Sequence, residues 1–163
     1  MLDLIIKNGS CYIDKDLKNQ DIGIKDNKIV EIGKISNKAS EVVDAAGLTV
    51  LPGCIDTQVH FREPGSTDAE DLHSGSRAAI VGGITSVFEM PNTNPPTSNK
   101  IEFRKKLGLA KNRMFCNYAF YFGATPDNAS ELADLKNLEG CCGIKLFVGS
   151  STGNLLVQHE ADI

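Results

Sequence analysis

The sequence predicts an α/β protein in which a small β module, residues 1–50, precedes the N-terminal part of a TIM-type (β/α) barrel, residues 51–163. Residues 1–50 contain short runs of β-branched and alternating residues, separated by Asn-Gly and Asp-Asn turn pairs. From residue 48 onward, strand-like runs alternate with helix-like segments, which is the pattern of parallel βα units. A closed barrel needs eight strands and about 250 residues. We therefore expect about four βα units, an incomplete barrel.

The first module should be a small antiparallel part of a composite β-sandwich, because its runs are short and joined by tight turns. The barrel strands are expected near 53–60, 84–90, 115–122 and 142–148, all parallel. Helices should connect them over roughly 68–81, 99–112 and 127–138. Asp68 is placed to cap the first helix, and Gly82-Gly83 should end it.

An incomplete barrel should leave its two edge strands unpaired and interior apolar residues such as Phe147 uncovered. This predicts a homo-oligomer or an aggregation-prone chain, or one that needs a second polypeptide to complete the barrel.

Composition narrows the class of protein. The chain is 41% hydrophobic and 23% charged, with a formal net charge of −4 and no long basic run, which argues against a nucleic-acid-binding surface. The opening "MLDLIIKNGS" holds only a four-residue apolar run, so neither a signal peptide nor a membrane span is expected, and the cytoplasm is the expected location. The odd number of cysteines lacks the spacing of a zinc knuckle, which favours buried thiols at Cys11, Cys54, Cys116, Cys141 and Cys142.

Polar residues alternate along the first expected barrel strand. By strand alternation Asp56, Gln58 and His60 share one face, which in a barrel is the interior, and the last of them lies at the C-terminal mouth where active sites form. The alternative is a polar strand end with a core histidine whose hydrogen bonds are satisfied.

Three stretches together resemble the dihydroorotases of the amidohydrolase superfamily, in order and at matching separations: "PGCIDTQVHFREPG", "EDLHSGSRAAIVGGITSVFEMPNTNPPT" and "GIKLFVGSSTGNLLV". The resemblance spans residues 50–157. It implies a zinc-dependent hydrolase barrel acting on a cyclic amide, with reversible hydrolysis of dihydroorotate to carbamoyl aspartate in pyrimidine synthesis as the parent reaction.

The resemblance also implies metal ligands. His60 matches the second histidine of the family's Asp-x-His-x-His strand, and Gln58 replaces the first, so one position should hold zinc more weakly because an amide oxygen suits it less than imidazole does. Lys145 matches the lysine that bridges the metals as a carbamate. Its apolar neighbours favour burial, and a neutral amine can add carbon dioxide; the alternative is a surface lysine at a strand end.

Arg62 and Asn92 match the family residues that hold the substrate carboxylate, which an arginine can bind with two charge-assisted hydrogen bonds. The resemblance also implies that hydantoinases and allantoinases lack this arginine. Local alternatives remain: Arg62 pairs with Glu63 or Asp71, and Asn92 only forms a turn before the Pro-Pro pair.

No catalytic residue is expected within the chain, because the family's catalytic aspartate and two later histidines lie on later strands. His73 and His159 are expected to be surface residues. Three hypotheses follow: an N-terminal half that is active only when a second polypeptide completes it, an inactive homologue serving as a structural partner of aspartate transcarbamoylase, and the remnant of a decayed gene.

Overall fold

The computed structural model describes residues 1–151 and 155–163 and divides into two compact units, Met1–Pro52 and Gly53–Ile163. Residues 152–154, part of the third family-like stretch, lie outside the described residues.

The first unit is built entirely of strands. They are β1 (Leu2–Lys7), β2 (Ser10–Ile13), β3 (Asp16–Asn19), β4 (Asp21–Lys25), β5 (Lys28–Gly33), β6 (Ala39–Asp44) and β7 (Thr49–Val50). They form a four-stranded sheet in the order β5-β4-β1-β6 and a three-stranded sheet in the order β3-β2-β7. The expectation of an antiparallel module was wrong in part, because β1 pairs with β6 and β2 with β7 in parallel.

Tight turns join the hairpins of this unit. Asp26 and Asn27, between β4 and β5, have φ angles of 51° and 59°, as the mirror-image hairpin turns require. The same holds for Asp14 and Lys15 between β2 and β3, with φ angles of 53° and 67°. The Asp-Asn pair was therefore a correct turn signal.

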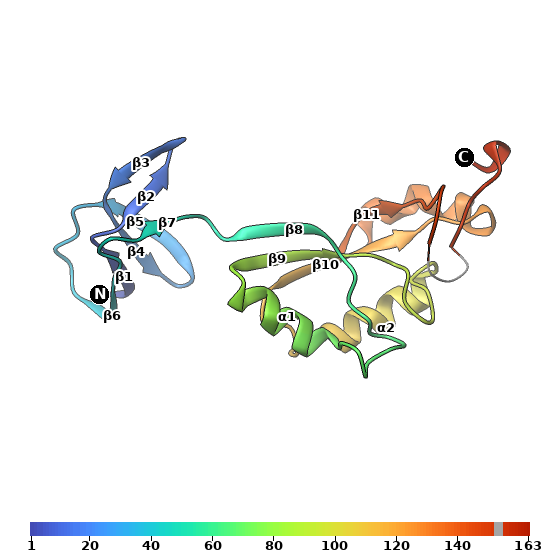
Figure 1. Cartoon of the computed structure of the whole chain (residues 1–163), viewed down its shortest axis with the longest axis horizontal. Helices are drawn as coiled ribbons and strands as arrows, with labels where there is room; N and C mark the ends of the chain where they lie inside the picture. The colour runs from blue at the N-terminus through green and yellow to red at the C-terminus, as the bar shows by residue number, and fades with distance from the viewer. Residues whose placement is uncertain (152–154) are drawn as a thin grey trace. The chain divides into compact units, whose positions relative to one another are not determined.

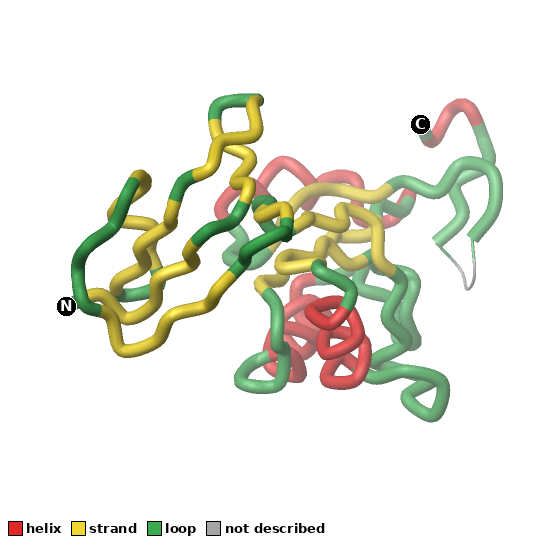
Figure 2. The backbone as a smooth tube through the Cα atoms, turned by 60° about the vertical axis from the view of Figure 1, so that its left-hand side comes forward, coloured by secondary structure: helices red, strands yellow, loops and turns green. Residues whose placement is uncertain are grey.

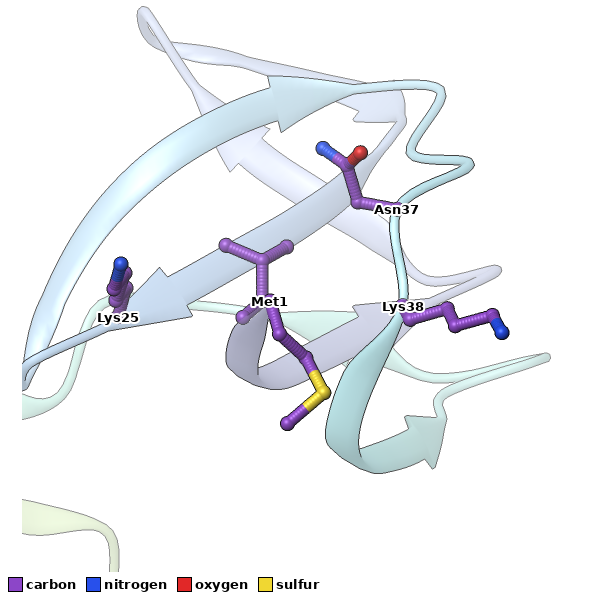
Figure 3. A pocket seen from close by; sticks show the side chains of 5 residues that line it. Met1, Lys25, Asn37 and Lys38 are labelled. Carbon is purple, nitrogen blue, oxygen red and sulfur yellow. The ribbon is translucent and has the colours of Figure 1, made fainter.

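A shallow pocket lies on the first unit, lined by Met1, Leu2, Lys25, Asn37 and Lys38 (Figure 3). The Lys38 side chain extends away from the other labelled side chains (Figure 3). The lining offers two ammonium groups and one amide but no convergent acid, base or nucleophile, so we place no catalytic site there.

The second unit contains the four expected parallel strands (Figure 1). They are β8 (Cys54–Val59), β9 (Ile84–Glu89), β10 (Asn117–Gly123) and β11 (Cys141–Lys145), in the order β11-β10-β9-β8. Each neighbouring pair is parallel. The order leaves β8 and β11 as the two edges, as expected for the first strands of a barrel.

Three helical segments connect these strands: α1 (Leu72–Val81), α2 (Lys100–Ala110) and the 3₁₀ segment η1 (Pro126–Asn137). A short 3₁₀ turn, η2 (Glu160–Asp162), follows β11 near the end of the chain. The helices α1 and α2 lie on the same side of the sheet (Figures 1 and 2). The third connection is a 3₁₀ helix, where an ordinary helix was expected. None of the helices in the described part of the chain is long and apolar enough to cross a membrane.

The N-cap of the first helix lies three residues later than predicted. It is Asp71 and not Asp68, because the Asp71 carboxylate accepts a 2.6 Å bond from the Ser74 amide while the Ser74 hydroxyl meets the Asp71 backbone. Gly82 and Gly83 end the helix as predicted, Gly83 with a φ of 85°.

The core of the second unit lies between the sheet and its helices. Phe103 of α2, fully buried, meets the rings of Phe120 and Phe122 on β10 at centroid distances of 6.4 and 6.2 Å. By strand alternation, Tyr121 lies on the opposite face of the sheet, which is the interior of a barrel. Its ring meets Phe88 of β9 there in an edge arrangement.

Two predictions about exposure were wrong. Phe147 is only 8% exposed, because residues 155–157 return beside it: Leu156 forms a bridge with Phe147, and the Val157 amide donates a 2.8 Å bond to the Phe147 carbonyl. Among the cysteines, Cys54 is exposed and Cys141 and Cys142 are partly exposed, because they lie on the edge strands β8 and β11.

Candidate functional site

The carboxyl ends of β8 and β9 come together, and the two residues proposed from different motifs meet there. The Met90 amide donates a 2.9 Å bond to the Val59 carbonyl, which extends the pairing of the two strands. One residue further along β8, His60 Nδ1 lies 2.8 Å from Asn92 Oδ1. The structure therefore places the predicted metal ligand and the predicted substrate-binding amide in direct contact.

The loops that follow these strands are also joined. The Asn94 amide donates a 3.0 Å bond to the Pro64 carbonyl, so the loop carrying Asn92 is fixed against the loop carrying Arg62. Gly65, with a φ of 123°, allows this approach, since a Cβ there would lie 3.0 Å from the Asn94 Cβ. Arg62 is exposed on this joined pair of loops.

The local alternative for Arg62 was wrong, because another arginine takes both expected partners. Arg113 donates 2.8 and 3.1 Å bonds to the two oxygens of Glu63 and lies 3.5 Å from Asp71. Glu63 also accepts a 2.9 Å bond from the Leu72 amide at the start of α1. Arg62 forms no hydrogen bond or ion pair through its guanidinium with the residues the structure describes, so that group is available to an anion.

Gln58 does not follow the simple alternation inferred from the sequence. The pairing of β8 with β9 shifts register between Asp56 and Val59, so three steps on β8 match two on β9. The Asp56 carboxylate accepts a 2.9 Å hydrogen bond from the backbone amide of Gln58 across this irregularity. Gln58 itself is exposed.

Lys145 ends β11, at the opposite edge of the sheet from β8. It pairs with Gly123, two residues beyond Tyr121, and so lies on the same interior face as Tyr121. It is partly exposed, and its ammonium lies 5.0 Å from the Phe147 ring centroid. A cation–π contact is thus its partner here, and the burial that its apolar sequence neighbours favoured is only partial.

A metal site needs several ligands that converge on one point. Among residues 1–151 and 155–163, no three His, Cys, Asp or Glu side chains are arranged to hold a metal ion. His60 suits a ligand role, because Asn92 Oδ1 as acceptor places the proton on Nδ1 and leaves the Nε2 lone pair for a metal. The chain thus presents one oriented imidazole and falls short of a complete metal site.

Sequence reasoning missed a buried ion pair beneath the site, between Glu89 at the end of β9 and Lys106 of α2. Both side chains are essentially inaccessible to solvent. Burial raises the pKa of Glu89 to about 8, although the Lys106 charge opposes the shift, and burial lowers the pKa of Lys106. The signal was readable: Lys106 occupies the buried helical face that Phe103 and Ala110 define.

Other histidines stay outside this region. His73 and His159 are exposed, as predicted, and the ring of His73 packs against Phe115 at a centroid distance of 5.0 Å.

Comparison with known proteins agrees with this architecture. The amidohydrolase family matches residues 49–146. The chain is 39% identical over 162 residues to a dihydroorotase of Methanosarcina acetivorans, covering 98% of this chain and 34% of that protein. It is 38% identical over 149 residues to an allantoinase of Escherichia coli, covering 91% of this chain and 33% of that protein.

Solved structures agree as well. The L-hydantoinase of Arthrobacter aurescens superposes with a TM-score of 0.87 at 31% identity, covering 96% of this chain and 35% of that one. A D-hydantoinase superposes with a TM-score of 0.76 at 32% identity, covering 90% of this chain and 33% of that one. The chain spans about a third of the length of the relatives it matches. Its strand order, the site at the carboxyl ends of β8 and β9 and these matches together show that the chain belongs to the amidohydrolase family.

Proposed function

We propose that this chain is the substrate-recognition part of a cyclic amidohydrolase of the dihydroorotase type, which hydrolyses the ring amide of dihydroorotate to give carbamoyl aspartate. The observation that carries the proposal is the contact of His60 with Asn92, with Arg62 exposed on the loop that follows His60. Both loops follow the carboxyl ends of adjacent parallel strands, which is the end of a barrel where ligands bind.

Arg62 would select a substrate that carries a carboxylate. A guanidinium binds a carboxylate through two parallel hydrogen bonds, and the Asn92 side chain, which contacts His60, would help to place the substrate from the neighbouring loop. Arg113 holds Glu63, so the acid next to Arg62 in the sequence does not compete for it. This favours dihydroorotate over hydantoin and allantoin, whose rings bear no such carboxylate.

Zinc is the proposed metal, bound through His60 Nε2 and through Lys145 as a carbamate, with Gln58 as a weaker ligand in place of a histidine. The metal would polarise the amide carbonyl and activate water. These residues do not complete a metal site, and no catalytic acid or base has been identified among them. The remaining ligands and the catalytic aspartate would come from the part of a full-length amidohydrolase that this chain does not span.

The same reasoning extends to partners. We propose that further strands pair with the edges β8 and β11 to close the barrel, and that the two sheets of residues 1–50 form part of a composite β-sandwich. Ile55 on β8 and Ile144 on β11, 60% and 46% exposed, are apolar side chains that such strands would cover.

A binding experiment on the chain itself tests the specificity. In NMR titrations of ¹⁵N-labelled protein without metal, dihydroorotate should shift the amide signals of the non-proline residues within 60–66 and 90–94, and hydantoin should not. Arg62→Gln should weaken dihydroorotate binding at least about tenfold, the loss expected for charge-assisted bonds worth about 1.5–3 kcal/mol each.

Arg104→Gln is the matched control, since Arg104 is also exposed but lies on α2 away from these loops. It should leave binding unchanged. Equal binding of both ring compounds, or equal losses in the two arginine variants, would contradict the proposed carboxylate recognition.

A further inference from the structure

The loop that carries Asn92 begins after Met90, and the Met90 carbonyl accepts a hydrogen bond from the Lys106 side chain. The Met90 carbonyl is followed by Pro91, which has no N–H, and both residues are buried. Lys106 Nζ donates a 3.2 Å bond to this carbonyl from α2. A buried carbonyl left without a donor costs about 1–3 kcal/mol, so this bond holds the beginning of the loop.

Glu89 offsets the cost of burying the Lys106 ammonium. Its carboxylate forms an ion pair with the Lys106 ammonium, which also lies 5.3 Å from the Phe120 ring centroid. Neither Glu89 oxygen accepts a hydrogen bond of good geometry from the described residues. A pair of this kind is a poor way to gain stability, because desolvation offsets much of its attraction. Its position suggests a different use.

The rest of the loop transmits the constraint to the site. The Thr97 amide donates a 2.9 Å bond to the Pro91 carbonyl, and the Gly123 amide donates a 2.9 Å bond to the Thr97 carbonyl, so the loop is fixed at both ends. Asn92 is two residues after Met90, whose carbonyl Lys106 binds, and the Asn92 side chain contacts His60.

We propose that Lys106 is a positioning residue: its ammonium, neutralised by Glu89, holds the Met90 carbonyl and thereby sets the Asn92 amide against His60. The importance of this contact rests on the proposed role of Asn92 in substrate binding. The contact itself can be measured without substrate or metal, so the two proposals fail separately.

Hydrogen exchange followed by NMR on the chain of residues 1–163 tests the proposal. In Lys106→Met, the amides of Asn94 and Thr97 should exchange about tenfold faster relative to the Phe120 amide of β10, as loss of one charged hydrogen bond predicts. The His60 ring should also lose the ¹⁵N pattern of a single Nδ1-protonated tautomer.

Lys105→Met is the matched control, because Lys105 is the next residue on α2 and its exposed ammonium pairs with Glu102. It should change neither reporter. If Lys106→Met accelerates exchange equally at all amides, or leaves the His60 tautomer intact, Lys106 is only part of the core and the proposal is wrong.

The double variant Glu89→Gln/Lys106→Met covers the case in which the single variant does not fold. It removes both buried charges, so it should fold, yet it still lacks the donor to Met90. Faster exchange at Asn94 and Thr97 is expected there too, and protection equal to the parent would overturn the proposal.

Discussion

The clamp between Glu63 and Arg113 offers a measurable test of how the Arg62 loop is held. Glu63 follows Arg62 directly, and its carboxylate receives two bonds from Arg113 and one from the Leu72 amide. Replacing Glu63 with glutamine keeps the volume of the side chain and one acceptor oxygen but removes the charge. We expect the free energy of unfolding to fall by about 2 kcal/mol.

That magnitude follows from the burial of the pair. The Glu63 side chain is 10% exposed and the Arg113 side chain 35% exposed. Exposed pairs contribute up to about 1 kcal/mol, whereas breaking a buried pair costs about 3–5 kcal/mol. A pair with one buried partner and two short bonds lies between these limits. Because Glu63 is shielded from solvent, most of the effect should persist at high salt.

Urea denaturation monitored by circular dichroism is the assay, with Glu102→Gln as control. Glu102 pairs with Lys105 on the surface of α2, so its loss should cost less than about 1 kcal/mol, mostly removable by salt. A Glu63→Gln variant as stable as the control, with an unchanged m-value, would refute this account of the clamp.

Three further predictions concern stability. Phe103→Ala should cost about 3–5 kcal/mol in urea denaturation, since it leaves a cavity among fully buried rings. Gly108→Ala should stabilise α2 by about 0.5–1 kcal/mol, because a Cβ there would meet no other atom. Gly75→Ala in α1 should instead destabilise the protein, because the new Cβ would lie 2.6 Å from the Phe61 ring. The melting temperatures of the two variants should therefore shift in opposite directions. In Lys106→Met, loss of the neighbouring positive charge should raise the pKa of Glu89 further above its parent value of about 8, so the stability lost relative to the parent should increase as pH rises beyond about 8, as denaturation across pH can show.

The strand order of the second unit could be predicted because each of its strands carries a strong local signal. Apolar runs with clear turn residues gave β8 to β11, and the parallel arrangement followed from the helical segments between them. The first unit was harder, because parallel pairs such as β1 with β6 join residues far apart in the sequence, and no local pattern specifies them.

The capping and pairing errors have one physical origin. Asp68, Asp71, Glu63 and Arg62 lie within ten residues, and all of them are plausible caps or partners by spacing alone. The choice is made by Arg113, which comes from beyond α2 and draws Glu63 and Asp71 to the start of α1. A contact across so many residues leaves no trace in the local sequence.

The two lysines show where reasoning from neighbouring residues ends. Lys145 has apolar neighbours in sequence, yet it lies at the end of an edge strand, partly exposed, with its ammonium over the ring of Phe147. Lys106 has charged neighbours in sequence, yet helical periodicity turns it inward beside Phe103 and Ala110. In a strand at the edge of a sheet, burial depends on what covers the strand, whereas in a helix packed on a sheet it depends on the angle around the axis. Periodicity therefore locates the buried lysine, and the burial of Lys145 depends on what covers the end of β11.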